Sequence, residues 1–424
     1  MEPDQNHKTR TLWLTGVLHA FTHLYQVALM PLYLLMQRDF GFHSVGQATV
    51  LLTVMLGACF APSYPIGMLA DRMSRKKLLG FGLAVNGLGF VGLAFAPNFA
   101  WALVAVAVAG FGGSFYHPAA TAMIARLFPN NTGKALGLAG IGASVGFFTG
   151  PLYAGWRAAI LEPTLGAAAW RRPVLELGVL GIVAAGLFLW QADQERPAAA
   201  ADRKHVPGGK MFPTPTLWLF FLAYCFAFSV RDFAGASMAS LGSLFLQKAH
   251  GYDPKWTGIA LSGIFLTSAI SNPLFGHLSD GGRKRWITTA LVVAAVAVAL
   301  FPRVPSRWTF PVLAVYGFFF MASYPMTEAA LMESVPDAVR ARVFGIFVMG
   351  GGVFGNFAHW AVGAKVKHMG DAARMASAYY PIYTVIALLV LISLSGLLCL
   401  KAIQKREGRT NPKAEHVDSV ALLT

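Results

Sequence analysis

Three charged side chains lie inside long apolar stretches of the sequence. Arg231 and Asp232 are neighbours in the stretch 214–246, and Glu328 lies in the stretch 309–334. Charges are costly to bury in apolar surroundings and usually serve a function there. An arginine fork matches a carboxylate or a phosphonate, so Arg231 is the candidate anchor for an anionic ligand. Asp232 and Glu328 are the candidate proton carriers.

Each of these assignments has a structural alternative. Arg231 and Asp232 could form an ion pair with neighbouring helices, and Glu328 could be a structural or an inner-vestibule carboxylate. Successive residues of a helix point about 100 degrees apart. Arg231 and Asp232 therefore cannot both point straight at one axis.

Two histidines, His19 and His23, lie one helical turn apart in an early apolar stretch. His23 precedes Asp232 by 209 residues, about half the chain. A histidine titrates near neutral pH, so His23 is a further candidate for proton coupling and ligand binding; a packing role is the alternative. The spacing could also place two nitrogens on one metal ion. Because no cysteine or acidic residue lies in that helix, we predict no metal site.

Other polar side chains in the apolar stretches are candidates for ligand contacts. They are Tyr25, Gln26, Tyr116, His117, Tyr324, Asn356 and His359. Tyr379, Tyr380 and Tyr383 lie nearer a helix end, where aromatic residues more often form an interfacial belt. We therefore rank Tyr116 and Tyr324 above these three.

The composition places the chain in a membrane. It has 424 residues, of which 56% are hydrophobic and 12% are charged, too much apolar surface for one soluble core. The net charge of +15 comes from short Lys and Arg clusters between apolar stretches, a pattern typical of cytoplasmic loops and not of nucleic-acid binding. The three cysteines lie in apolar stretches without neighbours, and the first ten residues are polar; we predict no disulfide and no cleaved signal peptide.

Twelve stretches are long enough to cross a bilayer as helices, which takes about 20 residues. We place them at 12–36, 46–70, 78–97, 100–126, 133–156, 172–192, 214–246, 256–279, 286–302, 309–334, 341–363 and 378–402. The sequence thus predicts an all-α membrane protein with two six-helix bundles. The domains are 1–190 and 214–402, with a cytoplasmic linker at 191–213 and a cytoplasmic tail at 403–424.

The distribution of Lys and Arg predicts the orientation. With both termini in the cytoplasm, 22 of the 34 basic residues lie on the inner side and 11 on the outer side. Cytoplasmic loops carry an excess of Lys and Arg. We therefore expect both termini and the linker in the cytoplasm.

A charged loop occurs once in each half. The first copy runs from Gly67 to Lys77 and contains Asp71, Arg72 and Arg75; the second contains Asp280 and Arg283, with Asp280 again 209 residues after Asp71. The carboxylate could pair with the basic cluster or meet a helix N-terminus of the other half. Such a latch would form only when the cytoplasmic side is closed. The alternative is that the cluster serves only as a topological signal.

These loops resemble the signature of the major facilitator superfamily of secondary transporters. The matching residues are Gly67, Ala70, Asp71, Arg72, Arg75, Lys76 and Lys77, with Gly276, Asp280, Arg283 and Lys284 in the second copy. The basic pair begins one residue early in the first copy. The resemblance implies the major facilitator fold of two pseudo-symmetric bundles, a substrate site near the midplane, and a loop that stabilises the outward-open state.

A glycine stripe in the fifth stretch adds a second resemblance. Gly146, Gly150 and Pro151 look like the antiporter motif of drug-exporting members of the superfamily. Small residues at this spacing let two helices approach closely, so simple helix packing is the alternative. Pro151 is expected to interrupt the backbone hydrogen-bond ladder near the outer end of the fifth helix, and Pro118 and Pro325 to bend the fourth and tenth helices.

Among exporters, the chain resembles the fosmidomycin-resistance-like group. The matching residues are His19, Tyr25 and Pro31 in the first helix, Tyr116-His117-Pro118 in the fourth, and Arg231 in the seventh. His23 and Ala119 stand where that group carries acids. The proton route and the drug specificity therefore do not follow from the resemblance.

The sequence predicts a proton-coupled secondary transporter that works by alternating access and exports a small amphiphilic or anionic compound. The alternative is an uptake symporter for an organic anion bound by Arg231. A receptor that binds without transport is disfavoured by the short tails. The sequence carries no nucleotide-binding or nucleophile motif, so we expect no enzyme and no cofactor. We expect a monomer in the inner (plasma) membrane of a bacterium.

Overall fold

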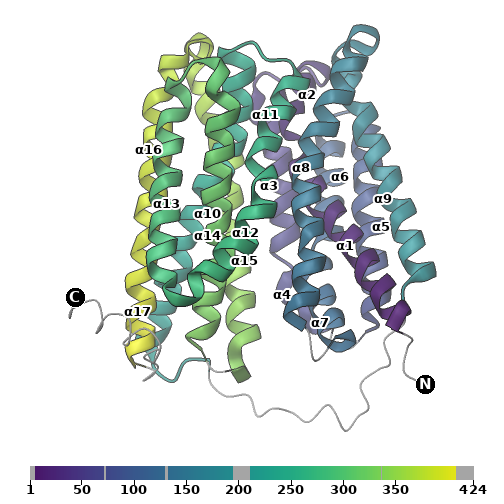
Figure 1. Ribbon diagram of the computed structural model, residues 1–424. Coiled ribbons are helices and arrows are strands. Elements are labelled where there is room, and N and C mark those ends of the chain that lie inside the picture. Colours follow the sequence, from purple (N-terminus) through teal and green to yellow (C-terminus); the bar gives the residue numbers. More distant parts are fainter. Residues whose placement is uncertain (1–4, 71–72, 129–131, 194–210, 336, 407–424) are drawn as a thin grey trace.

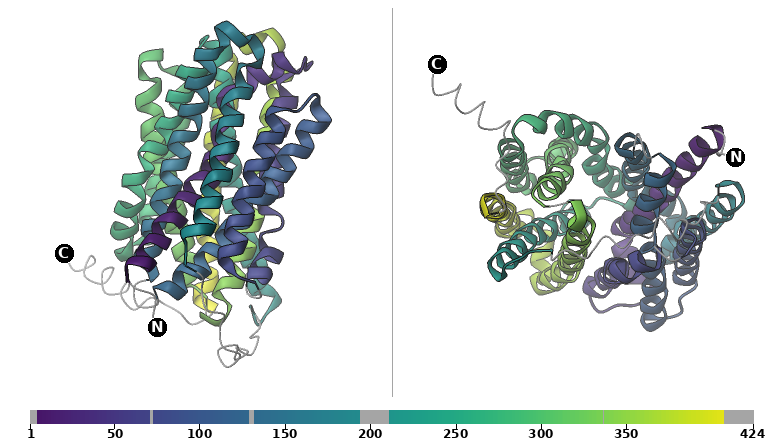
Figure 2. Two further views of the ribbon diagram at one scale, coloured as in Figure 1. Left: turned by 90° about the vertical axis from the view of Figure 1, so that its right-hand side faces the viewer. Right: turned by 90° about the horizontal axis from the view of Figure 1, so that it is seen from below.

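The computed structural model describes residues 5–70, 73–128, 132–193, 211–335 and 337–406. Within these ranges the chain is almost entirely helical and contains no strand. The helices stand side by side as two bundles, one from each half of the chain (Figure 1). Seen from the side of the termini, the two bundles lie next to each other (Figure 2).

The N-terminal bundle holds the first six predicted spans. Its helices are α1 (Gln5–Ala28), α2 (Tyr33–Asp39), α3 (Val45–Phe60), α4 (Ser63–Ala70), α5 (Arg75–Ala94), α6 (Phe99–Gly113), α7 (Tyr116–Leu127), α8 (Thr132–Leu165) and α9 (Arg171–Gln191). Short 3-10 turns, η1 (Met30–Leu32) and η2 (Gly166–Trp170), join α1 to α2 and α8 to α9.

The C-terminal bundle holds the other six. Its helices are α10 (Pro215–Ala249), α11 (Pro254–Leu266), α12 (Ser268–Leu278), α13 (Arg283–Leu300), α14 (Thr309–Glu333), α15 (Asp337–Met369), α16 (Tyr380–Ile392) and α17 (Gly396–Arg406). The 3-10 turns are η4 (Ser279–Gly281), η5 (Phe301–Arg303), η6 (Ser306–Trp308), η7 (Gly370–Arg374), η8 (Ala376–Tyr379) and η9 (Ser393–Ser395).

Ten stretches of the described chain are long and apolar enough to cross a membrane. One of them, Lys134–Gln191, contains both α8 and α9, and α1 with its polar first turns is not among the ten. With these two added, the predicted twelve spans are confirmed within the described residues. The observed helices α8 and α15 run several residues past the predicted ends at 156 and 363.

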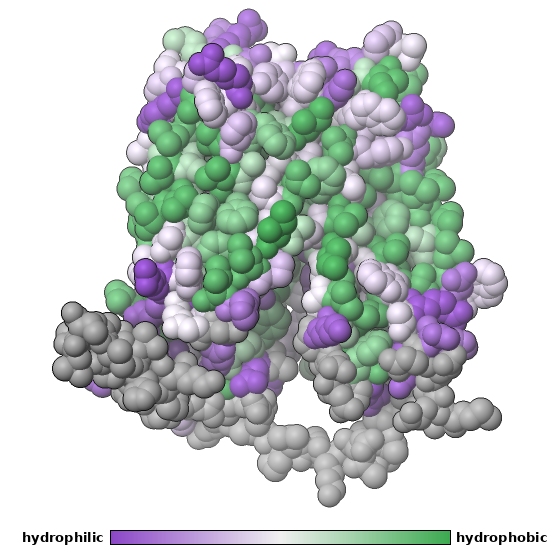
Figure 3. Space-filling model, viewed as in Figure 1, coloured by the Kyte–Doolittle hydropathy of each residue, from purple (hydrophilic) through white to green (hydrophobic). Residues whose placement is uncertain are grey.

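The surface confirms that the bundles are built for a bilayer. Many large apolar side chains are exposed, among them Trp190, Leu398, Phe226 and Ile270. Figure 3 shows a hydrophobic band around the molecule between two more hydrophilic ends. Apolar surface of this extent is stable only in contact with lipid.

Polar residues at helix starts explain several boundaries. Ser74, Asn98, Thr214 and Asp253 each accept a hydrogen bond from the backbone N–H three residues later, which caps α5, α6, α10 and α11. A capping side chain satisfies a backbone donor that the first helical turn leaves unpaired. The local sequence therefore fixes where these spans begin.

Three prolines occupy two kinds of position in the helices. The fourth span is interrupted at Ser114–Phe115, and Pro118 lies in the first turn of α7 that follows. Pro151 and Pro325, in contrast, lie inside the continuous helices α8 and α14. Pro151 does not end α8, which continues to Leu165. A proline removes one backbone donor from the helix, and neighbouring helices can support the helix beyond it.

Helix packing repeats between the halves. In the N-terminal half α1 packs on α8 and α5 on α9; in the C-terminal half α10 packs on α15 and α13 on α16. A side chain at Gly146 would clash with the backbone of Ala20, and one at Gly355, 209 residues later, would clash with Asp232. The duplication seen in the sequence therefore extends to close helix contacts.

The halves contact each other mainly at the end opposite the termini. Gly155 on α8 lies against the backbone of Pro254, and Gly258 on α11 lies against that of Pro151. On the other side of the interface, Gly363 on α15 lies against Gly46 and Thr49. Figure 3 shows a hollow between the halves that opens toward the side of the termini.

Candidate functional site

Arg231 is the centre of a buried polar cluster in the C-terminal half. Its side chain is 1% exposed. Its Nε and Nη2 donate to Oδ1 of Asp232 at 3.0 and 2.8 Å, and its Nη1 donates to Oγ1 of Thr327 at 2.8 Å. The guanidinium also lies 3.9 Å from the ring centre of Tyr324 and 5.1 Å from that of Phe228. Every face of the cation is therefore occupied by the protein.

Asp232 and Glu328 lie close to this guanidinium but are less enclosed. The Asp232 side chain is 20% exposed, and the hydroxyl of Tyr324 interacts with its carboxylate. Glu328, on α14, is half-buried and interacts electrostatically with Arg231 and Asp232. Two carboxylates thus share one arginine. When one of them is protonated, the other still pairs with the guanidinium, so no buried charge is left unpaired.

This cluster lies at the boundary between the halves. Asp232 faces Gly351 and Gly355 of α15, where any side chain would clash with it. The next residue, Gly352, lies against the ring of Phe60 on α3 of the N-terminal half. The structure therefore places the charges of α10 beside the interface between the two bundles.

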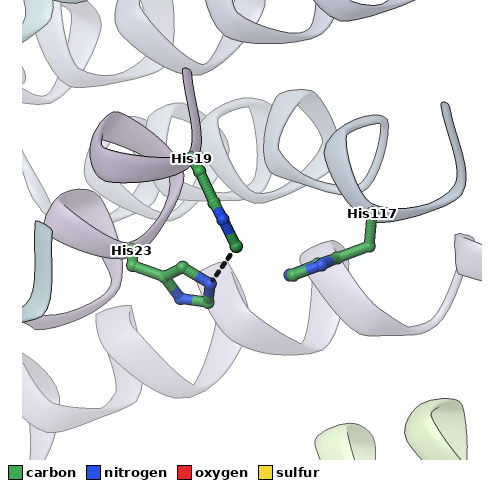
Figure 4. Close-up of side chains that lie close together, drawn as sticks. All are labelled: His19, His23 and His117. Atoms are coloured by element: carbon green, nitrogen blue, oxygen red, sulfur yellow. Dashed lines mark hydrogen bonds between the residues drawn. The ribbon is translucent and has the colours of Figure 1, made fainter. Parts of the chain in front are cut away.

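A second cluster lies in the N-terminal half and consists of His19, His23 and His117. His19 Nε2 lies 3.1 Å from His23 Nε2, and one nitrogen of each of the three rings lies within 4.8 Å of the others (Figure 4). His19 stacks on Tyr116, and His23 packs on Phe147, which stacks on Phe265 of the other half. Among the described residues, these three could hold a metal ion.

A hydrogen-bonded chain crosses between the halves on the side of these clusters that faces away from the termini, which is the outer side in the predicted orientation. Asn356 and His359 of α15 contact each other at 3.2 Å, and His359 Nδ1 lies 2.6 Å from the hydroxyl of Ser240. Ser240 in turn contacts the Tyr33 hydroxyl of the N-terminal half at 2.9 Å. The predicted contact residues Asn356 and His359 thus join the two bundles.

Two predicted contact residues lie away from the interface. Tyr25 is 1% exposed and donates to the carbonyl of Leu177 inside the N-terminal bundle. The amide oxygen of Gln26 contacts His23 Nδ1 at 3.0 Å, while its amide nitrogen is buried without a partner beside a void of about 10 Å³. Tyr25 is therefore placed as a packing residue, and Gln26 as a support for His23.

The predicted gate residues are only partly visible. Asp71 and Arg72, and the side chain of Asp280, lie outside the described residues. Arg75 donates to the carbonyl of Ala122 at 3.4 Å, and Gly67 lies near Pro118, both within the N-terminal half. Arg283 forms an ion pair with Glu333 of α14 at 2.5 Å and donates to Ser279. These contacts of the two arginines stay inside their own bundles.

The glycine stripe has two separate packing roles. Gly142, Gly146 and Gly150 lie against the backbone of α1. Further along α8, Pro151 and Gly155 contact α11 of the other half. One helix therefore holds α1 inside the N-terminal bundle and also closes the outer end of the interface.

Several residues of these clusters were not singled out from the sequence. They are Tyr33, Phe147, Phe228, Ser240, Ser323 and Thr327. Hydroxyl and aromatic residues are frequent in apolar helices, so nothing in the sequence separates these from others of their kind.

A larger pocket of about 680 Å³ lies at the outer end of the interface. Its lining includes the ion pair of Arg38 and Glu162 and, from the other half, Gln247 and Tyr252. The ends of α2, α8 and α10 line this pocket, and none of its lining residues belongs to either cluster. We interpret it as an outer vestibule.

Two duplicated helical bundles with buried polar clusters at their interface define a membrane transporter of the two-repeat class. The model of the Major Facilitator Superfamily matches residues 12–359 and 232–422. The chain belongs to this superfamily, as its charged loops predicted.

Its relatives include drug exporters. The chain is 23% identical over 335 residues to the fosmidomycin resistance protein of Escherichia coli (strain K12), covering 78% of this chain and 79% of the relative. It is 27% identical over 329 residues to the multi-drug resistance efflux pump PmrA of Streptococcus pneumoniae (serotype 4), covering 74% and 78%.

A solved structure with a similar fold is that of a bacterial homolog of the human lysosomal transporter Spinster, in an inward-facing and unoccupied conformation. The TM-score is 0.73 at 16% identity, and the match covers 97% of this chain and all of the other. At this identity the likeness confirms the fold alone.

Proposed function

We propose that the protein is a proton-coupled secondary transporter that exports a small amphiphilic compound by alternating access. The observation that carries the proposal is the buried cluster of Arg231, Asp232 and Glu328 at the interface of the halves. Buried ionisable groups in a membrane protein mark ion and substrate routes. Drug efflux among its relatives supports the direction of transport.

The two carboxylates provide the basis for coupling substrate movement to proton movement. With Arg231 held by Asp232, the cluster carries one excess negative charge when Glu328 is ionised. An amphiphile with a cationic or hydrogen-bond-donating group can bind that charge, and a proton arriving from outside displaces it. Because proton and substrate then compete for one site, they move in opposite directions.

The shape of the molecule supports alternating access. The halves are closed by backbone contacts at the outer glycines, including Gly155 and Gly363, and a hollow opens at the end of the termini. With both termini in the cytoplasm, as the basic residues indicate, this form is open to the cytoplasm. We propose that it acts as a monomer in a bacterial inner membrane, with 1–190 and 214–402 as the moving units.

Transport in proteoliposomes tests this function. Purified protein is reconstituted, an inward proton gradient is applied, and outward movement of fluorescent amphiphiles is followed. We expect gradient-driven export that Glu328→Gln abolishes and that Glu162→Gln, at the outer vestibule, leaves intact. Export that persists without a gradient, or in Glu328→Gln, contradicts the proposal.

The pairing of Arg231 with Asp232 favours a second candidate, an uptake symporter for an organic anion. A carboxylate substrate that takes Arg231 displaces Asp232, which then binds a proton because it has lost its cation. Anion and proton would thus bind together and move in the same direction. Proton uptake that accompanies anion uptake, and that requires Arg231, distinguishes this candidate from the exporter.

A further inference from the structure

The histidine cluster has the donor set of a metal site. His19 and His23 lie one turn apart on α1, and His117 reaches them from α7. Figure 4 shows the three rings pointing toward one another. Imidazole is a preferred ligand for transition-metal ions such as Zn²⁺, Co²⁺ and Ni²⁺. The sequence argument against a metal site considered only the first helix and did not include His117 of the fourth span.

Hydrogen bonds fix which nitrogens of two rings are available. His19 Nδ1 lies 2.9 Å from the carbonyl oxygen of Ala139, and His23 Nδ1 lies 3.0 Å from the amide oxygen of Gln26. These oxygens can only accept, so both Nδ1 atoms carry the hydrogen. Each neutral ring therefore presents a lone pair at Nε2. Such oxygen acceptors behind histidine ligands are the usual support of metal sites.

The two Nε2 atoms lie so close together that their lone pairs repel each other. They lie 3.1 Å apart, and two acceptors at hydrogen-bond distance repel unless a cation lies between or beside them. Nitrogens of a tetrahedral site with bonds of about 2.0–2.1 Å lie about 3.3 Å apart. His19 and His23 therefore already have the separation of two ligands of one ion.

We propose that His19, His23 and His117 bind one divalent transition-metal ion of the Zn²⁺, Co²⁺ and Ni²⁺ class. His117 is exposed, and its nitrogen needs a shift of up to about 1.5 Å to reach the spacing of tetrahedral ligands. Three protein ligands leave one coordination position for water or for a donor atom of a bound compound. Ca²⁺ and Mg²⁺ are disfavoured because they prefer oxygen ligands.

The site is independent of the transport proposal. The bound ion adds positive charge to the wall of the N-terminal half, and the proposed transport chemistry uses the carboxylates of the C-terminal half. The ring of Phe147 lies between His23 and Phe265 of the other bundle. Loss of metal binding would therefore leave the export proposal standing, and loss of export would leave the metal site standing.

The experiment is metal binding to the full chain, purified in detergent with a tag that contains no histidine and stripped with a chelator. Co²⁺ is titrated and followed by the visible absorption of the tetrahedral ion, and Zn²⁺ is added in competition. We expect one Co²⁺ per chain, displaced by Zn²⁺. His117→Ala and His23→Ala should weaken binding by at least about 100-fold, and Gln26→Ala by about 10-fold or more.

His277→Gln is the matched control, because this histidine is exposed on α12; its binding should equal that of the wild type. His117 is itself exposed, so His117→Ala decides the question even if His23→Ala fails to fold. No saturable binding, or binding that His117→Ala leaves unchanged, overturns the proposal. In that case the rings are a packing cluster in which the reversed Gln26 amide donates to His23.

Discussion

Equivalent positions in the two halves carry a histidine in one half and an aspartate in the other, in different surroundings. His23 in α1 and Asp232 in α10 are 209 residues apart, and both lie beside the interface. Around His23 the neighbouring groups are two further neutral imidazole rings; around Asp232 they are a guanidinium, a second carboxylate and a phenol. The neutral histidine cluster of the N-terminal half can thus bind a cation. The cluster of the C-terminal half already contains a cation, the guanidinium of Arg231.

The comparison also separates what the duplication preserved from what it changed. Glycines 209 residues apart, Gly142 with Gly351 and Gly146 with Gly355, hold the same helix pair close in each bundle. Helix packing was kept, because a clash there displaces whole helices. The side chains that these helices present to the interface diverged. We infer that the two bundles share one helix arrangement, and that the proposed metal binding and proton coupling belong to different bundles.

The largest effect is expected from removing the cation of the C-terminal cluster. Arg231→Ala leaves Asp232 without its partner and should lower the unfolding free energy by about 3–5 kcal/mol. The double variant with Asp232→Asn should recover part of this loss, because it removes the unpaired Asp232 charge and leaves Glu328 as the one carboxylate of the cluster. Thermal unfolding in detergent measures both. If the single and double variants are equally unstable, the pair is not the source of the stability.

Overpacking of the glycine contacts comes next. Gly146→Ala and Gly355→Ala should each cost about 1–3 kcal/mol, because the new methyl group meets a neighbouring helix in each half. Gly140→Ala and Gly350→Ala are the controls, since nothing lies within 4 Å of the added atom. A loss confined to one half would show that the helix packing is not equivalent.

The charged loops give a smaller contrast. Asp71 belongs to the fuller copy, and the second copy has Gly281 and Gly282 in place of two of its residues. We expect Asp71→Asn to slow transport about 10-fold more than Asp280→Asn, the equivalent of one hydrogen bond to a charged group. Initial rates in proteoliposomes measure it. Equal losses contradict an asymmetric gate.

Much of the fold could be predicted from the sequence, since spans, repeat and loop motif follow from local apolarity and spacing. The site was predicted only in part. Arg231 and Asp232 point apart as helix neighbours, yet the long arginine side chain folds back onto Asp232. His117, the third member of the histidine cluster, belongs to another helix, so the spacing of His19 and His23 could not reveal the cluster. Contacts between distant helices depend on how the bundles pack, which local patterns do not encode.

The central claim is that proton coupling belongs to the C-terminal half. It is tested most directly by substrate-dependent proton flux, recorded with a pH-sensitive dye inside proteoliposomes, for Glu328→Gln, Asp232→Asn and His23→Gln. The account predicts that the flux is lost in Glu328→Gln, reduced in Asp232→Asn and retained in His23→Gln. Flux that is lost in His23→Gln and retained in the two acidic variants would contradict it.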